Sequence, residues 1–185
     1  MKNLEIKALC ENVSEAEKIA HSLGAEFQWR DWQTDTFFRV TNGRLKLRES
    51  GRRAAELIAY FRPDTASARW SDYDILPVDD PQKVKSILTR TLGILEVVRK
   101  KRSLFLLANA RIHLDTVERL GRFIEFEIVV SDSEQEQRAP EFLAFLQKKF
   151  GITSEALVPF AYVDLLLGPF SGEKRPPNQS ATGQC

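Results

Sequence analysis

Charged residues two positions apart recur in several stretches of the chain that look extended. Glu5 and Lys7 have this spacing, and so do Glu125 and Glu127. Side chains alternate between the two faces of a β-strand, so residues two apart share a face and lie about 6.6 Å from each other. The same spacing relates three further sets, which are Arg44, Lys46 and Arg48; Lys100 and Arg102; and Arg111, His113 and Asp115. Each of these strands is therefore predicted to have one charged face.

The charged faces combine many cations with a few carboxylates. The acids are Glu5, Asp115, Glu125 and Glu127, and the bases are Lys7, Arg44, Lys46, Arg48, Arg62, Lys100, Arg102 and Arg111. Clustered carboxylates favour a hard divalent cation such as Mg²⁺ or Mn²⁺, which prefers oxygen ligands and phosphate. The planar fork of arginine suits phosphate oxygens. A triphosphate bound together with a metal ion would satisfy both signs of charge.

For a single strand, a charged face usually meets water and the apolar face packs on the core. Here the same pattern repeats on separate strands, and the predicted helices carry apolar stripes of their own that must be buried. If those helices cover the apolar outer faces of the strands, the charged faces look inward. Interior charges must be paired or must bind ions, which again predicts an anion site with metal.

Extended segments dominate the pattern that must position these residues. We expect strands at 3–10, 27–33, 36–41, 44–49, 54–62, 70–76, 94–107, 111–117 and 122–130, and helices at 14–24, 80–92, 140–150 and 160–167. Asn42-Gly43 is a strong hairpin turn. Closure of so many strands removes exposed sheet edges, so the sequence predicts an α+β fold with a closed antiparallel β-barrel and helices packed on the outside.

The length of 185 residues suits one domain, which we place at 1–169. Residues 170–185 lack large apolar side chains and are predicted to be a disordered tail. The 27 basic and 26 acidic residues give a net charge of only +1, which argues against a nucleic-acid partner. No apolar run is long enough for a membrane span, and charges near the N-terminus argue against a secretory signal, so we expect a cytoplasmic protein. We expect it to be a monomer or a homodimer.

Several short motifs follow one another in a defined order. They are Asn3-Leu4-Glu5-Ile6-Lys7, Asp35-Thr36-Phe37-Phe38, Gly43-Arg44-Leu45-Lys46-Leu47-Arg48, Glu56-Leu57-Ile58, Arg62-Pro63, Ser71-Asp72-Tyr73, Arg111-Ile112-His113-Leu114-Asp115, and Gly121-Arg122-Phe123-Ile124-Glu125-Phe126-Glu127. Together with Val98, Lys100 and Arg102, they make residues 3–167 resemble the CYTH superfamily of triphosphate tunnel metalloenzymes, which includes class IV adenylate cyclases and thiamine triphosphatases.

The resemblance implies an eight-stranded antiparallel barrel that forms a tunnel. It implies metal ligands at Glu5, Asp115, Glu125 and Glu127, phosphate binding by the eight bases named above, and catalytic roles for Glu5, Lys7 and Arg62. The family opens on Glu-x-Glu-x-Lys, whereas this chain has Asn3 in place of the first glutamate. An amide is a weaker ligand than a carboxylate, so a second metal ion is expected to bind less tightly.

These features give a primary function and three alternatives. The primary hypothesis is a triphosphatase that uses Mg²⁺ or Mn²⁺ to hydrolyse inorganic tripolyphosphate or a small organic triphosphate such as thiamine triphosphate, because hydrolysis needs no base-specific pocket. The first alternative is a class IV adenylate cyclase, which converts ATP to cyclic AMP and pyrophosphate. The second alternative is a non-catalytic polyphosphate or nucleotide-binding module. A nucleic-acid barrel of the OB type is weaker, because Trp29, Trp32, Phe37 and Phe38 interleave with apolar positions.

Overall fold

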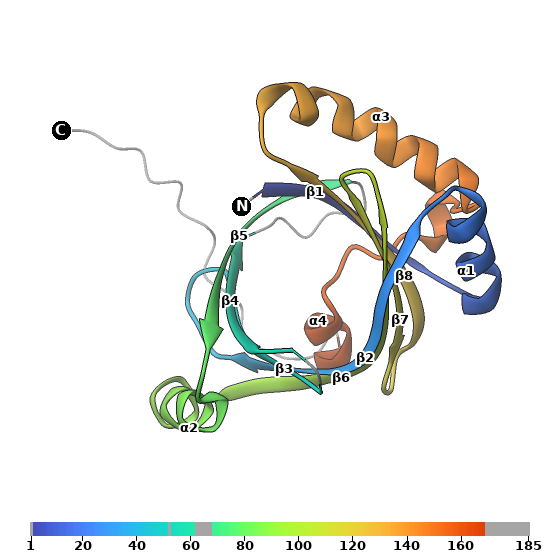
Figure 1. Cartoon of the computed structure of the whole chain (residues 1–185). Helices are drawn as coiled ribbons and strands as arrows, with labels where there is room; N and C mark the ends of the chain where they lie inside the picture. The colour runs from blue at the N-terminus through green and yellow to red at the C-terminus, as the bar shows by residue number, and fades with distance from the viewer. Residues whose placement is uncertain (1, 52, 62–67, 169–185) are drawn as a thin grey trace.

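A computed structural model describes residues 2–51, 53–61 and 68–168 of the chain. Eight strands close into a barrel in the order β1-β5-β4-β3-β2-β6-β7-β8, and every neighbouring pair is antiparallel (Figure 1). The strands are β1 (Lys2–Leu9), β2 (Glu26–Phe38), β3 (Arg44–Ser50), β4 (Ala55–Phe61), β5 (Arg69–Val78), β6 (Ile94–Leu107), β7 (Ala110–Val117) and β8 (Gly121–Val130). The closed α+β barrel expected from the sequence is confirmed.

Strand β2 replaces two of the predicted strands. The predicted strands at 27–33 and 36–41 leave out Thr34 and Asp35, but both residues pair with β3 and with β6. Asp35 is 2% exposed because its side chain points to cations inside the barrel. The two predicted strands are therefore one, and the nine predicted strands become eight.

Three helices lie on the outside of the barrel (Figure 1). α1 (Val13–Ser22) and α2 (Pro81–Leu92) are N-capped by Asn12 and Asp80. α3 (Ser133–Lys149) starts before the predicted helix at 140–150, because the Asp132 side chain accepts a hydrogen bond from the Gln135 amide at 2.8 Å and begins the helix there. Within the described residues, none of the helices is both long and apolar enough to cross a membrane.

The hydrophobic core lies between the barrel and these outer helices. Ile6, Ile112 and Phe126 are outward-facing strand residues that are almost fully buried, and they belong to one cluster with Leu143 and Leu146 of α3. The apolar strand faces thus pack under helices, and the charged faces point into the barrel. This arrangement is the one that the sequence predicted.

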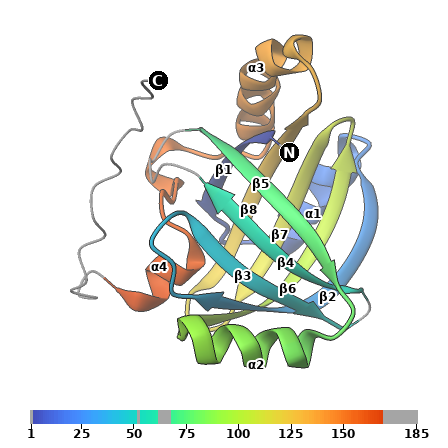
Figure 2. The same cartoon turned by 90° about the vertical axis from the view of Figure 1, so that its left-hand side faces the viewer.

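The last helix, α4 (Tyr162–Leu167), lies across one end of the barrel (Figures 1 and 2). Tyr162 and Val163 are buried in a cluster with Phe37, Val98 and Phe123, whose side chains form an apolar layer at that end of the interior. The sequence predicted a stretch that packs on the outside. The structure differs from this prediction because the inward-facing positions change from charged to apolar at this end of the barrel. An apolar helix is therefore buried there.

Candidate metal and triphosphate site

All eight strands and the start of α4 line one cavity of about 130 Å³ inside the barrel. Its charged lining residues are Glu5, Lys7, Asp35, Lys46, Arg48, Lys100, Arg102, Arg111, Glu125 and Glu127. Of the predicted site residues, Arg44 and Asp115 lie in the interior beside this lining, and Arg62 lies outside the described residues. The structure therefore gathers most of the predicted residues around one space.

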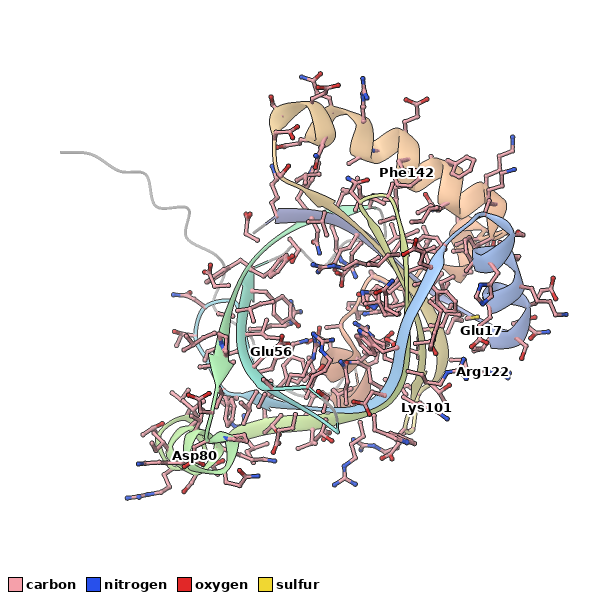
Figure 3. All side chains as sticks on the ribbon, viewed as in Figure 1. Glu17, Glu56, Asp80, Lys101, Arg122 and Phe142 are labelled. Carbon is pink, nitrogen blue, oxygen red and sulfur yellow. The ribbon has the colours of Figure 1, made fainter. Side chains whose placement is uncertain are left out.

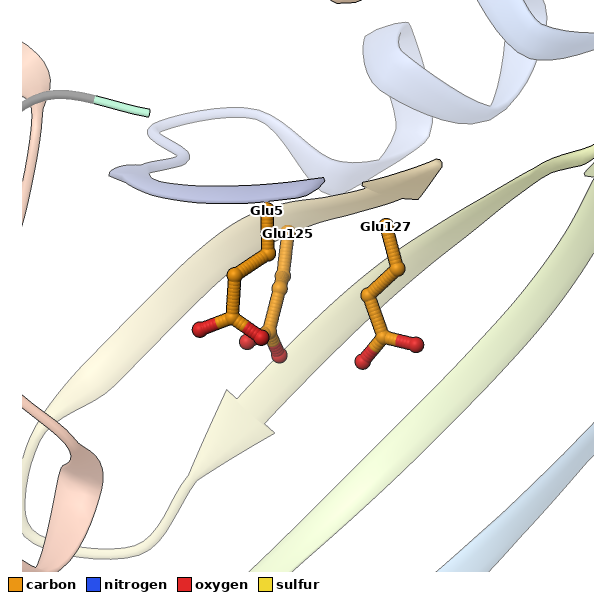
Figure 4. Close-up of side chains that lie close together, drawn as sticks. All are labelled: Glu5, Glu125 and Glu127. Carbon is orange, nitrogen blue, oxygen red and sulfur yellow. The ribbon is translucent and has the colours of Figure 1, made fainter. Parts of the chain in front are cut away.

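Three glutamates form a compact carboxylate group on the paired strands β1 and β8. Glu5 lies opposite Glu127 in the ladder, and Lys7 lies opposite Glu125. One oxygen from each of Glu5, Glu125 and Glu127 lies within 4.8 Å of the others, and the three side chains point the same way (Figure 4). Oxygen donors so close together fit Mg²⁺ or Mn²⁺, because such ions take hard carboxylate ligands.

Each of these glutamates lies next to a basic side chain. Arg69 donates from Nε to Glu5 Oε1 at 3.1 Å, and Arg102 donates to Glu125 Oε2 at 2.8 Å. His113 Nε2 lies 3.5 Å from Glu127 Oε1. Partners of this kind hold metal-binding side chains in place.

Arg69 was missed in the sequence because the predicted strand began at residue 70. The available signal was its two-residue spacing from Ser71, which places both residues on the same face of β5. Ser71 belongs to the Ser71-Asp72-Tyr73 motif.

Glu127 is deprotonated at neutral pH. Burial by itself would raise the pKa of Glu127, but the charge of the neighbouring His113 and a hydrogen bond from it lower the pKa to about 2. The charge of Glu125 acts in the opposite direction, because two carboxylates at short range repel each other. A glutamate held ionised in this way has the charge state that a divalent cation needs.

Asp115, the fourth predicted ligand, has different partners. Among the described residues it is not part of the carboxylate group, and it is fully buried on β7. Arg102 donates to both of its oxygens at 2.7 and 2.6 Å, and the Tyr162 hydroxyl donates at 2.8 Å. Burial raises the pKa of Asp115, yet the adjacent Arg102 outweighs it and the pKa is lowered. Asp115 thus links the cavity wall to α4.

A second buried carboxylate, Asp35, gathers the cations on the other side of the cavity. Arg48 donates to it from Nε at 2.8 Å, and the ammonium groups of Lys100 and Lys46 lie 2.7 and 3.3 Å from it. Burial and the charge of Arg48 lower the pKa of Lys46 to about 7. The motif containing Asp35 was noticed in the sequence, but a role for this carboxylate was not predicted.

Lys7 and Arg44 contact the segment that closes the barrel end. Lys7 Nζ donates to the Phe160 carbonyl at 3.3 Å and lies 4.0 Å from the centre of the Tyr162 ring. Arg44 forms an ion pair with Asp164 of α4 at 2.7 Å. Two of the predicted phosphate-binding residues are therefore engaged with the C-terminal segment.

The strand register chosen for β6 is confirmed. Lys100 and Arg102 are buried in the interior, at 1% and 5% exposure, whereas Arg99 and Lys101 are exposed. Lys101 points away from the barrel, as does Arg122 of β8 (Figure 3). The alternation that assigned the inner and outer faces thus holds on both strands.

The chain matches a known family. The CYTH domain model matches residues 1–162, and the chain belongs to the CYTH domain family. A Methanocaldococcus jannaschii protein named as a candidate adenylate cyclase is 24% identical over 176 residues, which cover 89% of this chain and 98% of that protein.

Solved structures share the architecture. A conserved hypothetical protein of Pyrococcus furiosus is 23% identical, with a TM-score of 0.76 over 87% of this chain and 98% of that one. A Hippeastrum protein, HpAC1, is 15% identical, with a TM-score of 0.60 over 89% of this chain and 94% of that one. HpAC1 is described as a candidate adenylyl cyclase with a dominant triphosphatase activity. The named relatives are thus of two kinds, adenylate cyclase-like and triphosphatase.

Proposed function

We propose that this protein is a divalent-metal-dependent triphosphatase, which hydrolyses inorganic tripolyphosphate or a small organic triphosphate such as thiamine triphosphate. One observation carries the proposal: the group of Glu5, Glu125 and Glu127 shares a single cavity with the cations Lys46, Arg48, Lys100 and Arg102. A phosphate chain bound with a metal ion suits both sets at once. The dominant triphosphatase activity described for HpAC1 is consistent with this choice.

In this proposal Glu5, Glu125 and Glu127 hold Mg²⁺ or Mn²⁺, and Asp115 positions Arg102 beside them. A bound metal ion of this kind neutralises phosphate oxygens and makes a coordinated water more acidic. Glu5 would contribute to catalysis through this role. Asn3, which lines the same cavity, would give a second ion a weaker ligand than a glutamate does.

The basic residues would bind the phosphate groups. Arg48, Lys100 and Arg102 are held by carboxylates in the interior, so little reorganisation is needed when an anion arrives. Lys46 and Arg111 line the same cavity. Lys7 and Arg44 would act at the closed end, and Arg62 is proposed as a catalytic and phosphate-binding residue from the family motif alone.

A class IV adenylate cyclase is the second candidate, because the M. jannaschii relative is named as a candidate adenylate cyclase. The same cations would hold ATP, and the ribose 3′-hydroxyl would attack the α-phosphorus and release pyrophosphate.

Because the net charge is +1 and the site is internal, we propose a small-molecule substrate rather than nucleic acid. We expect a cytoplasmic monomer or homodimer.

A product assay separates these functions. The protein is incubated with tripolyphosphate, thiamine triphosphate and ATP, each with Mg²⁺ or Mn²⁺, and orthophosphate, pyrophosphate and cyclic AMP are measured. Orthophosphate from at least one substrate is the expected result. Cyclic AMP and pyrophosphate from ATP, without orthophosphate from any substrate, would identify a cyclase. Tight triphosphate binding without turnover under either metal would identify a binding module.

A further inference from the structure

The outer face of β5 carries exposed acidic and apolar side chains. Among the described helices, α1 packs mainly on β2 and β7, α2 on β2 and β3, and α3 on β1 and β8. Alternate residues of β5 line the cavity, so Asp72, Asp74 and Leu76, which lie between them, point outward. Leu76 is 61% exposed, and both aspartates are exposed. We call these three residues the β5 strip.

The neighbouring helix α2 has an exposed stripe of the opposite charge. Val84 and Leu88 of α2 pack against the barrel, whereas Lys83, Ile87 and Arg90 are exposed. These three exposed residues are spaced by four and three positions, so they lie on one side of the helix. We call them the α2 stripe. Because α2 runs along the lower edge of the surface formed by β4 and β5 in Figure 2, the stripe and the strip are neighbours on the molecule.

The charges of both sets are left for an external partner. Four exposed side chains form no hydrogen bond or ion pair within the described part of the chain, namely Asp72, Asp74, Lys83 and Arg90. The strip combines two negative charges with an apolar residue, and the stripe combines two positive charges with an apolar residue. The two surfaces are therefore complementary in charge, and both belong to the same chain.

The two sets also match in spacing. Ile87 follows Lys83 by four helical residues, which is about 6 Å along the helix axis. Leu76 follows Asp74 by two strand residues, which is about 6.6 Å along the strand. When Ile87 packs on Leu76, Lys83 can therefore face Asp74. This contact does not form within one copy, because the stripe and the strip lie side by side and both face outward.

We propose that two copies of this chain associate about a two-fold axis, with the α2 stripe of each copy packed on the β5 strip of the other. In an interface of this symmetry, every contact occurs twice, so Lys83 of each copy faces Asp74 of the other. A second copy is the partner that fits, because the chain itself carries both complementary sets. Contact of Ile87 with Leu76 buries apolar surface, and the charges fix the orientation. The interface lies outside the barrel, so this inference does not depend on the proposed function.

The experiment measures the mass of the protein by sedimentation velocity at concentrations from about 1 µM to about 100 µM. We expect a reversible equilibrium between monomer and dimer. Asp74→Lys and Lys83→Glu should each raise the dissociation constant at least tenfold, because each substitution places like charges opposite each other twice in the interface. Lys101→Glu is the matched control, because Lys101 is exposed on β6, which neighbours neither β4 nor β5, and it should leave the constant unchanged.

Mixing the two reversed variants tests the geometry. Asp74→Lys and Lys83→Glu in equal amounts should form a heterodimer with a dissociation constant within about threefold of the wild-type value, because both charge pairs are again of opposite sign. The chain that carries both substitutions should form a homodimer for the same reason. When diluted to the monomer, each single variant should unfold at the wild-type temperature, because the exchanged side chains are exposed. A loss of dimer then reports on the interface and not on the fold.

Three results overturn the inference: a monomer throughout the concentration range, a dimer that neither reversal weakens, or a mixture of the two variants that stays monomeric. Growth of the wild-type protein beyond two copies also overturns it. Such growth would indicate a head-to-tail contact, which continues from copy to copy, whereas a two-fold contact ends at the dimer.

Discussion

Arg102 binds Asp115 through two parallel hydrogen bonds, from Nε to Oδ1 at 2.7 Å and from Nη2 to Oδ2 at 2.6 Å. The sequence placed the two residues in different sets, one for phosphate and one for metal. Their pairing in the structure favours a positioning role for Asp115, since Arg102 also reaches Glu125 at 2.8 Å. Under the proposed function, Asp115 would act on the carboxylate group through the arginine that it holds.

Metal affinity should depend more on Glu127 than on Asp115. We expect Glu127→Gln to weaken Mn²⁺ binding at least tenfold, because it removes a member of the carboxylate group, and Asp115→Asn to weaken it less than threefold. Titration of each folded variant with MnCl₂, followed by calorimetry, tests this. Equal losses in the two variants would show that Asp115 is itself a ligand.

Asp35 should matter for stability in the absence of substrate. Asp35→Asn leaves Arg48, Lys46 and Lys100 in the interior without their shared counter-charge, which should lower the free energy of unfolding by about 3–5 kcal/mol. Tripolyphosphate should restore part of this loss, because it supplies negative charge at the same place. Thermal unfolding with and without tripolyphosphate, compared with Asp74→Asn at an exposed position of β5, measures both effects. An equal shift by tripolyphosphate in wild type and Asp35→Asn would contradict the expectation.

The pKa of Lys46, lowered to about 7, predicts a pH dependence of stability. Between pH 7 and the ordinary lysine pKa near 10.5, the unfolded chain binds a proton at Lys46 that the folded chain does not. The contribution of Lys46 to the free energy of unfolding therefore increases as the pH rises through this range. Lys46→Met should remove that increase, as judged by urea unfolding at pH 7, 8 and 9. Parallel pH profiles in the two proteins would show that the Lys46 pKa is not lowered.

The same residue predicts proton uptake on binding. With its pKa lowered to about 7, Lys46 should be largely neutral in the free protein at pH 8, and a phosphate group beside it should raise its pKa so that it takes up a proton. Calorimetry of tripolyphosphate binding in EDTA, in two buffers with different ionisation enthalpies, should show an uptake of up to about one proton in wild type and little in Lys46→Arg. Arginine keeps its charge at this pH, so the variant is a matched control. Equal uptake by both proteins would assign the proton to another group.

Asn3→Glu should strengthen a second metal site. The new carboxylate would lie on the same face of β1 as Glu5, two residues away. We expect the variant to bind a second Mn²⁺ at least tenfold more tightly than wild type, counted by equilibrium dialysis. An unchanged stoichiometry and affinity would show that this position does not reach a metal.

The barrel and the carboxylate group were predictable because they depend on alternation within single strands. Glu5, Glu125 and Glu127 follow from the two-residue period, and the structure brings them together by pairing β1 with β8. The position of α4 was not predictable, because it depends on the apolar layer around Phe37, which several strands build together. The pairing of Arg102 with Asp115 likewise depends on the register between β6 and β7, which places the two residues directly opposite each other. The spacing of residues along one strand does not encode that register.

The helix across one end of the barrel makes the cavity a blind tube. Arg111 lines the cavity with its side chain 37% exposed, so a ligand can approach it on that side. Because α4 occupies one end of the tube, under the proposed function a long polyphosphate chain would not thread through the barrel and be cut at internal bonds. With this barrel end closed, the proposed hydrolysis would have the substrate enter and both products leave at the other end, so the two products would leave in sequence rather than from opposite ends.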